Sequence, residues 1–185
     1  MLSKTNRGKQ KQVHQKQGAT CKEVVCQHYK PIYKFMAYLT NDATLAEDLT
    51  QETFLCAWEN FENYKGNSSV ETWLHKIAYH KFVDSRRRLK CNTAAMSVMC
   101  SEKPGASEAV HPLRQLMADE ELSRIYEAMR KLASEEYLII LLHYIQSLSF
   151  SQMAEILEQS TGTVKWKTNQ TLKKLRTYLC DEVEL

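Results

Sequence analysis

The sequence is poor in the residues that turn a chain sharply, with only 5 Gly and 3 Pro among 185 residues. An all-β fold needs turn signals every 8–12 residues or so, and these are missing. The chain is long enough for one medium domain or two small ones, and its 43% hydrophobic and 25% charged residues are ordinary for a globular protein. We therefore predict an all-α fold.

Long apolar runs are also absent. The densest stretch, residues 137–145, is much shorter than the roughly 18–20 apolar residues of a membrane span, and it contains His143. Residues 1–20 carry five basic side chains but no apolar core after them, unlike a secretory signal. The sequence thus predicts a cytoplasmic protein without direct membrane insertion.

Motifs for catalysis and for metal binding are missing as well. The six cysteines show neither CxxC nor Cys/His zinc spacing, and His75 and His80 are five residues apart, which is not a helical metal spacing. No Ser/His/Asp, HExxH, P-loop or paired-carboxylate pattern stands out. We expect no catalytic residue, no metal and no cofactor, and we single out only Cys91 and Cys100 as a pair for redox sensitivity.

Charge is strongly segregated along the chain, although the net charge is only +3. Residues 73–90 and 160–176 are basic, whereas residues 41–63 contain six acidic side chains and no Lys or Arg. Two separate cationic segments predict a polyanion that is contacted at two places. The acidic segment between them predicts a different partner.

Composition and apolar spacing divide the chain into a basic arm, two helical domains and a linker. The arm (1–20) is expected to be disordered, either as a solvated tail or as a contact to DNA. The linker (91–118) loses apolar periodicity and contains Pro104, Gly105 and Pro112. The first domain is residues 21–90 and the second is residues 119–182. Helices are predicted at 21–40, 42–61, 70–89, 119–132, 135–146, 149–157 and 161–180, and Pro31 is expected to end or kink the first.

The last two predicted helices have the pattern of a helix-turn-helix. Ser149 and Gln152 form a capping box, Ser134 and Ser160 are candidate N-caps, and a tight turn separates the helices. The last helix directs small polar, amide and cationic side chains outward, which suits a major groove. A helical hairpin with a solvated lysine face is the alternative interpretation. The candidate duplex-binding residues are Thr161, Thr163, Lys165, Trp166, Lys167, Asn169 and Gln170.

The helix that starts near Asp42 has two distinct sides. One side is apolar, with Phe54, Ala57, Trp58 and Phe61. The other side is acidic around a single leucine, a pattern that either docks a basic protein surface or is simply solvated. Its candidate partner-binding residues are Asp48, Gln51, Glu52 and Leu55.

The helix after Val70 combines cations with aromatic rings, which is what single-stranded nucleic acid requires. Trp73 taken alone is more typical of ordinary core packing than of a nucleic-acid contact. The preceding loop, residues 64–69, is polar enough to receive a flipped base. The candidate single-strand residues are Tyr64, Lys65, Asn67, Ser68, Lys76, Tyr79, His80, Lys81, Arg87 and Arg88.

These motifs together resemble the extracytoplasmic-function (ECF) subfamily of sigma-70 RNA polymerase sigma factors. The run Ala46-Glu-Asp-Leu-Thr-Gln-Glu-Thr-Phe54 resembles the polymerase-binding part of sigma region 2, and Trp73-Leu-His-Lys-Ile-Ala78 with Asp84-Ser-Arg-Arg-Arg88 resembles its promoter-melting, minus-10 helix. The stretch Leu148-Ser-Phe-Ser-Gln-Met-Ala-Glu-Ile-Leu157 with Thr163-Val-Lys165 resembles region 4, which reads the minus-35 element.

The resemblance implies an alternative sigma factor that directs core polymerase to one promoter class and initiates transcription. Its implied partners are bacterial core RNA polymerase (the β′ clamp and the β flap), promoter DNA and an anti-sigma factor. Four features depart from the family pattern: His80 in place of Asn, Glu158 near a common turn glycine, Ala133 in place of a frequent proline, and the set Trp166, Thr168 and Gln170 in the recognition helix. A stand-alone helix-turn-helix regulator is the alternative, although it leaves the acidic patch and the 70–89 helix without a role.

Overall fold

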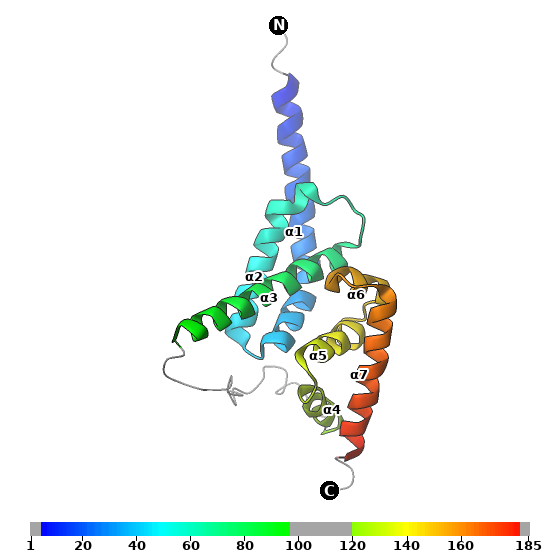
Figure 1. Cartoon of the computed structure of the whole chain (residues 1–185). Helices are drawn as coiled ribbons and strands as arrows, with labels where there is room; N and C mark the ends of the chain where they lie inside the picture. The colour runs from blue at the N-terminus through cyan, green and yellow to red at the C-terminus, as the bar shows by residue number, and fades with distance from the viewer. Residues whose placement is uncertain (1–4, 97–119, 182–185) are drawn as a thin grey trace.

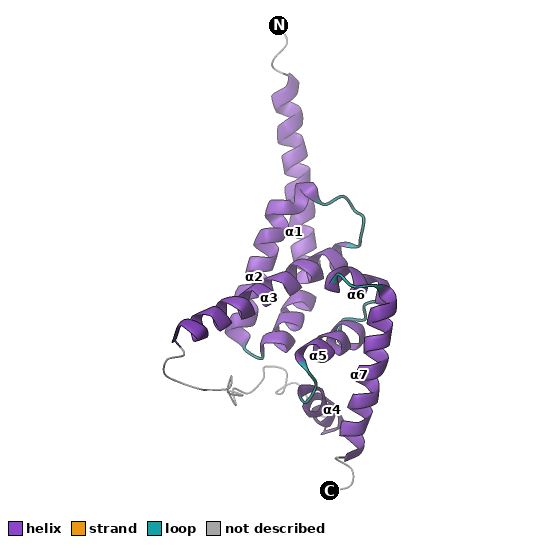
Figure 2. Cartoon of the chain, viewed as in Figure 1, coloured by secondary structure: helices purple, strands orange, loops and turns teal. Residues whose placement is uncertain are grey.

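The protein folds into two helical lobes in a computed structural model, which describes the backbone of residues 5–96 and 120–181 and the side chains of residues 22–89 and 124–180. Within these ranges there are helices and loops but no β-strand (Figure 2). Of the predicted linker, residues 97–118 lie outside these ranges, whereas residues 91–96 are helical and continue the helix predicted at 70–89; the side chain of Cys91 and all of Cys100 also lie outside them. No helix in the described part of the chain is long and apolar enough to cross a membrane.

The first lobe consists of α1 (Thr5–Thr40), α2 (Ala43–Asn60), the short 3-10 helix η1 (Phe61–Asn63) and α3 (Val70–Met96). Figure 1 shows α3 crossing both α1 and α2. Asp42 caps α2 by accepting hydrogen bonds from the N–H groups of Thr44 and Leu45, at 2.9 and 3.1 Å. The core of this lobe is built from one apolar stripe of each helix. It contains Ile32, Phe35, Met36, Leu49, Phe54, Leu74 and Ala78.

Two features of the first lobe differ from the sequence-based expectation. The structure places residues 5–20 in α1, whereas a disordered arm was predicted; Lys and Gln are good helix formers, and a helix propagates readily from a packed end. The helix also continues through Pro31 rather than ending there. Burial of Ile32 and Phe35 beyond the proline favours continuation despite the lost backbone hydrogen bond.

The second lobe consists of α4 (Glu120–Arg130), α5 (Ser134–Ile140), the π-helical turn η3 (Leu141–Ile145), α6 (Phe150–Leu157) and α7 (Thr161–Asp181). The predicted caps of α6 and α7 are confirmed: Ser149 and Gln152 form a capping box, and Ser160 Oγ accepts the Thr163 N–H at 3.1 Å. The cap of α5 is Ala133 rather than the predicted Ser134, because Ala133 holds the extended backbone and the Glu136 carboxylate accepts its N–H at 3.1 Å.

The two lobes pack directly on one another, with α6 lying against α3 (Figure 1). Buried residues from both lobes form one continuous apolar cluster, which includes Leu74 of α3 and Met153 of α6. Polar bonds also cross the contact: the Tyr137 hydroxyl donates to the Tyr38 carbonyl at 3.1 Å, and the Gln152 amide donates to Thr72 Oγ1 at 3.0 Å. The second lobe is therefore held over one face of the first.

Candidate nucleic-acid interface

The acidic side of α2 is open to solvent, as the sequence pattern predicts. Asp48 and Gln51 are exposed, and Leu55 is 65% exposed although it is a large apolar residue. Glu52 is half-buried, and its Oε2 lies 3.9 Å from Nζ of Lys81 on α3. Glu52, a candidate for protein binding, thus faces Lys81, which is a candidate for DNA binding. The exposed leucine framed by carboxylates can dock a basic, partly apolar surface.

Trp58 belongs to this exposed face and was wrongly grouped with the buried side of α2. Its side chain is 56% exposed, whereas Phe54 and Ala57 are buried. The signal was present in the spacing, because Trp58 follows Gln51 by seven residues and Leu55 by three, both helical neighbours on one face. We call Asp48, Gln51, Leu55 and Trp58 the α2 face.

The loop between α2 and α3 is fixed by aromatic packing. The rings of Tyr64 and Trp73 lie 4.9 Å apart between centroids, and the Tyr64 hydroxyl donates to the carbonyl of Ser68. Gly66 adopts a left-handed backbone, φ 72°, with open space where a Cβ would stand. Lys65 and Asn67 are exposed at the tip and Ser68 is half-buried. Tyr64 therefore supports the loop, and only the exposed tip, with Lys65 and Asn67, is open to contact a flipped base.

The basic side of α3 presents its cations in a row, and most are already engaged. Lys76 and His80 approach Glu158 of the second lobe, Lys81 approaches Glu52, and Arg87 approaches Asp84 at 3.7 Å. Arg88 is exposed. Tyr79 is half-buried against the core rather than directed outward with the cations. Arg88 can meet a phosphate directly, whereas Lys76 and Lys81 can do so only where their internal carboxylates give way.

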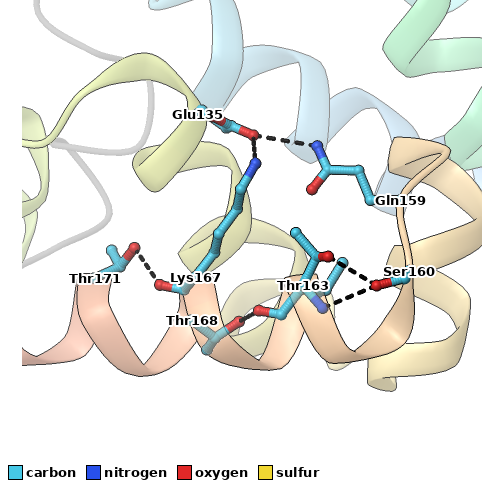
Figure 3. Close-up of polar contacts among 8 residues, drawn as sticks. Glu135, Gln159, Ser160, Thr163, Lys167, Thr168 and Thr171 are labelled. Atoms are coloured by element: carbon cyan, nitrogen blue, oxygen red, sulfur yellow. Dashed lines mark hydrogen bonds and ion pairs between the residues drawn. The ribbon is translucent and has the colours of Figure 1, made fainter.

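The helix-turn-helix is built by side-chain bonds around Ser160 and along α7. Figure 3 shows Ser160 paired with Thr163, and Thr168 and Thr171 each donating to a carbonyl one turn earlier. Lys167 reaches back from α7 to the Glu135 carboxylate of α5, which also accepts from Gln159 at 3.2 Å. These bonds lower the pKa of Glu135, chiefly through Lys167 and then through Gln159.

Only part of the predicted duplex-binding set is free on the surface of α7. Lys165, Asn169 and Trp166 are exposed, Trp166 by 62% of its surface. Lys167 is paired with Glu135, and Thr163 is also exposed but hydrogen-bonded to the cap. Thr161 and Gln170 are half-buried, and Gln170 lines an open hollow of about 410 Å³ between α5 and α7 together with Trp166. From the predicted set, the outward face thus offers the cation Lys165, which also lies 5.8 Å from the centre of the Phe150 ring, the amide Asn169 and the ring of Trp166.

The described residues include no group of three or more His, Cys, Asp or Glu side chains placed to hold a metal ion. The exposed cations, amides and aromatic rings of the site can recognise a nucleic acid by charge, hydrogen bonding and stacking.

Both lobes match known family models. Residues 24–91 match Sigma-70 region 2, and residues 122–175 match Sigma-70 region 4. The chain is 28% identical to the RNA polymerase sigma factor YlaC of Bacillus subtilis, over 81% of this chain and 84% of that protein. It is 26% identical to the ECF RNA polymerase sigma factor SigX of the same organism, over 82% of this chain and 79% of that protein.

Solved structures share the fold. The sigma factor RpoE of Bartonella quintana, in complex with the anti-sigma factor NepR, superposes with a TM-score of 0.69 at 20% identity, over 85% of this chain and 95% of that one. CnrH, in complex with the cytosolic domain of CnrY, gives a TM-score of 0.65 at 20% identity, over 89% of this chain and 90% of that one. The chain belongs to the extracytoplasmic-function subfamily of the sigma-70 family of RNA polymerase sigma factors.

Proposed function

We propose that this protein is an alternative sigma factor that brings core RNA polymerase to one class of promoters in the cytoplasm and contributes no catalytic group of its own. The observation that carries the proposal is the presence of both sigma regions, in order, in one chain. A stand-alone regulator has no use for region 2. Here region 2 is a complete packed lobe with its own exposed face.

In this proposal the α2 face binds the β′ clamp of the polymerase. Its exposed Leu55 and Trp58 supply apolar contact area, and Asp48 supplies charge for a basic partner surface. Region 4 would contact the β flap. An anti-sigma protein, such as the one bound to the RpoE neighbour, would compete for these surfaces.

The DNA contacts are divided between the lobes. The loop tip and the basic side of α3 would hold the melted non-template strand by neutralising phosphates and stacking bases. The outward face of α7, with Lys165, Trp166 and Asn169, would enter the major groove of the minus-35 duplex. Each contact is weak alone, and polymerase makes them act together by fixing their separation.

In-vitro transcription with purified core polymerase tests the proposal. We expect the wild-type chain to support initiation at a subset of genomic promoter fragments. The double variant Asp48→Arg/Gln51→Ala should stay folded, because both side chains are exposed, but should lose core binding and transcription. A Glu155→Gln chain, changed at an exposed position on α6, serves as the control.

Two results would contradict the proposal. One is a chain that neither binds core polymerase nor starts RNA synthesis on any fragment. The other is tight, sequence-specific retention of a promoter duplex by the free chain, with no effect of added polymerase, which would favour the helix-turn-helix regulator.

A further inference from the structure

Two of the candidate single-strand residues on α3, Lys76 and His80, face the end of α6. Lys76 Nζ lies 3.0 Å from Oε1 of Glu158, and His80 Nε2 lies 3.9 Å from the same oxygen. The Glu158 side chain is 63% exposed, so its carboxylate lies at the rim of the contact between the lobes. One anionic oxygen therefore occupies the position between two groups assigned to a DNA phosphate.

The backbone conformation at Glu158 does not favour a glutamate. This residue ends α6 in the left-handed conformation, φ 54° and ψ 41°, which glycine adopts without steric cost. A carboxylate in this turn contributes nothing to the cap, whose backbone N–H bonds to the carbonyl of Ala154. Its contacts lie across the gap on α3, and Lys76 lowers the pKa of Glu158.

Other bonds hold the same two helices together beneath the carboxylate. Gln152 of α6 donates to Thr72, and Gln146, just before α6, lies 3.3 Å from Nε2 of His75. Thr72 and His75 are fully buried in this arrangement. The contact between the lobes therefore combines these polar bonds with apolar packing.

We propose that Glu158 is an intramolecular mimic of a DNA phosphate, which occupies Lys76 and His80 of the single-strand face while region 4 is packed on region 2 in the free protein. The outward face of α7 remains uncovered, so this contact competes with a single strand for Lys76 and His80 without blocking duplex contact. The inference rests on the proposed function for the role of α3. It adds that the free chain inhibits itself through one named side chain.

Binding of a short fluorescein-labelled oligothymidine single strand to the free, full-length chain tests this inference. Glu158→Gln keeps the size of the side chain and removes its charge, and we expect roughly two- to fivefold tighter binding, in line with loss of one exposed ion pair. Glu155→Gln removes the same charge from an exposed site on α6, where the described residues show no ion pair with an α3 cation, and should leave binding unchanged. Circular dichroism establishes that each variant is folded, and Glu158→Gly, which also relaxes the turn, serves as a second variant.

A double-mutant cycle identifies the partner. In a Lys76→Gln background, Glu158→Gln should have little further effect, because the released cation is no longer there. Equal gains from Glu158→Gln and Glu155→Gln would overturn the inference, as would no gain from either Glu158 variant or a full gain in the Lys76→Gln background. None of these measurements contains polymerase, so the inference and the proposed function can fail independently.

Discussion

At the scale of the residue, His75 shows how one side chain ties the lobes together. It is fully buried on α3, its Nδ1 lies 2.8 Å from the carbonyl of Glu71, and its ring meets Phe35 edge-on at 5.1 Å. Burial lowers the pKa of His75 below its ordinary value, because the charged imidazolium loses hydration there. The folded protein therefore favours the neutral ring.

This burial predicts a loss of stability in mild acid. The pKa of His75 is lower in the folded chain than its unfolded value of 6.5, so unfolding takes up a proton once the pH falls below that value. The stabilisation is complete above pH 6.5 and declines toward the folded pKa, by at most about 1.4 kcal/mol per pH unit. Urea unfolding of wild type and of His75→Gln across this range measures the effect. Equal pH dependence in the two chains would contradict it.

At the scale of the element, the single helix α2 has one surface that packs in the core and another that is exposed for binding. Its buried stripe, which includes Phe54 and Ala57, packs against α1 and α3, and its α2 face directs Leu55 and Trp58 to solvent. Helical periodicity separates the two functions, so that binding and folding respond to different substitutions.

A matched pair of variants tests this separation. Trp58→Ala removes an exposed ring, and we expect it to change the free energy of unfolding by less than about 0.5 kcal/mol. It should weaken binding to core polymerase about tenfold, as loss of an aromatic anchor at an interface does. Phe54→Ala should instead cost about 3 kcal/mol of stability through the cavity it leaves. Urea unfolding and a fluorescence binding assay measure the two effects, and a Trp58→Ala chain that binds normally would remove this residue from the proposed interface.

At the scale of the whole molecule, the contact between the lobes sets which surfaces are available. Tyr137 of α5 is half-buried, and its hydroxyl crosses to the Tyr38 carbonyl of α1. Burial raises the pKa of Tyr137, so the hydroxyl remains a donor at any physiological pH. Because polar bonds such as this one supplement the apolar packing, modest changes should shift the balance between closed and open forms.

Tyr137→Phe removes this interlobe hydrogen bond and keeps the ring. We expect the closed form to lose about 1 kcal/mol, which raises the ratio of open to closed molecules about fivefold. Small-angle X-ray scattering should then report a larger radius of gyration. Tyr144→Phe, at an exposed position in η3, is the control and should leave the radius unchanged.

Much of the fold followed from local patterns in the sequence. The caps at Asp42, Ser149 and Ser160 depend on residues within three positions, so helix starts could be predicted from neighbours alone. Pro31 could not be interpreted this way, because burial of the residues after it decides whether the helix continues. Trp58 is different, because its spacing from Gln51 and Leu55 already placed it on the exposed side of α2, where its side chain is 56% exposed.

By itself the sequence determined the helices, the division into two sigma regions and the surfaces that carry charge, since each depends on spacing along one segment. Only the tertiary structure decided that Lys76 and His80 meet Glu158, that Lys167 is neutralised by Glu135, and that Tyr64 packs on Trp73. Those pairings join residues that are 9 to 82 positions apart, and no periodic pattern encodes which cation will face which carboxylate.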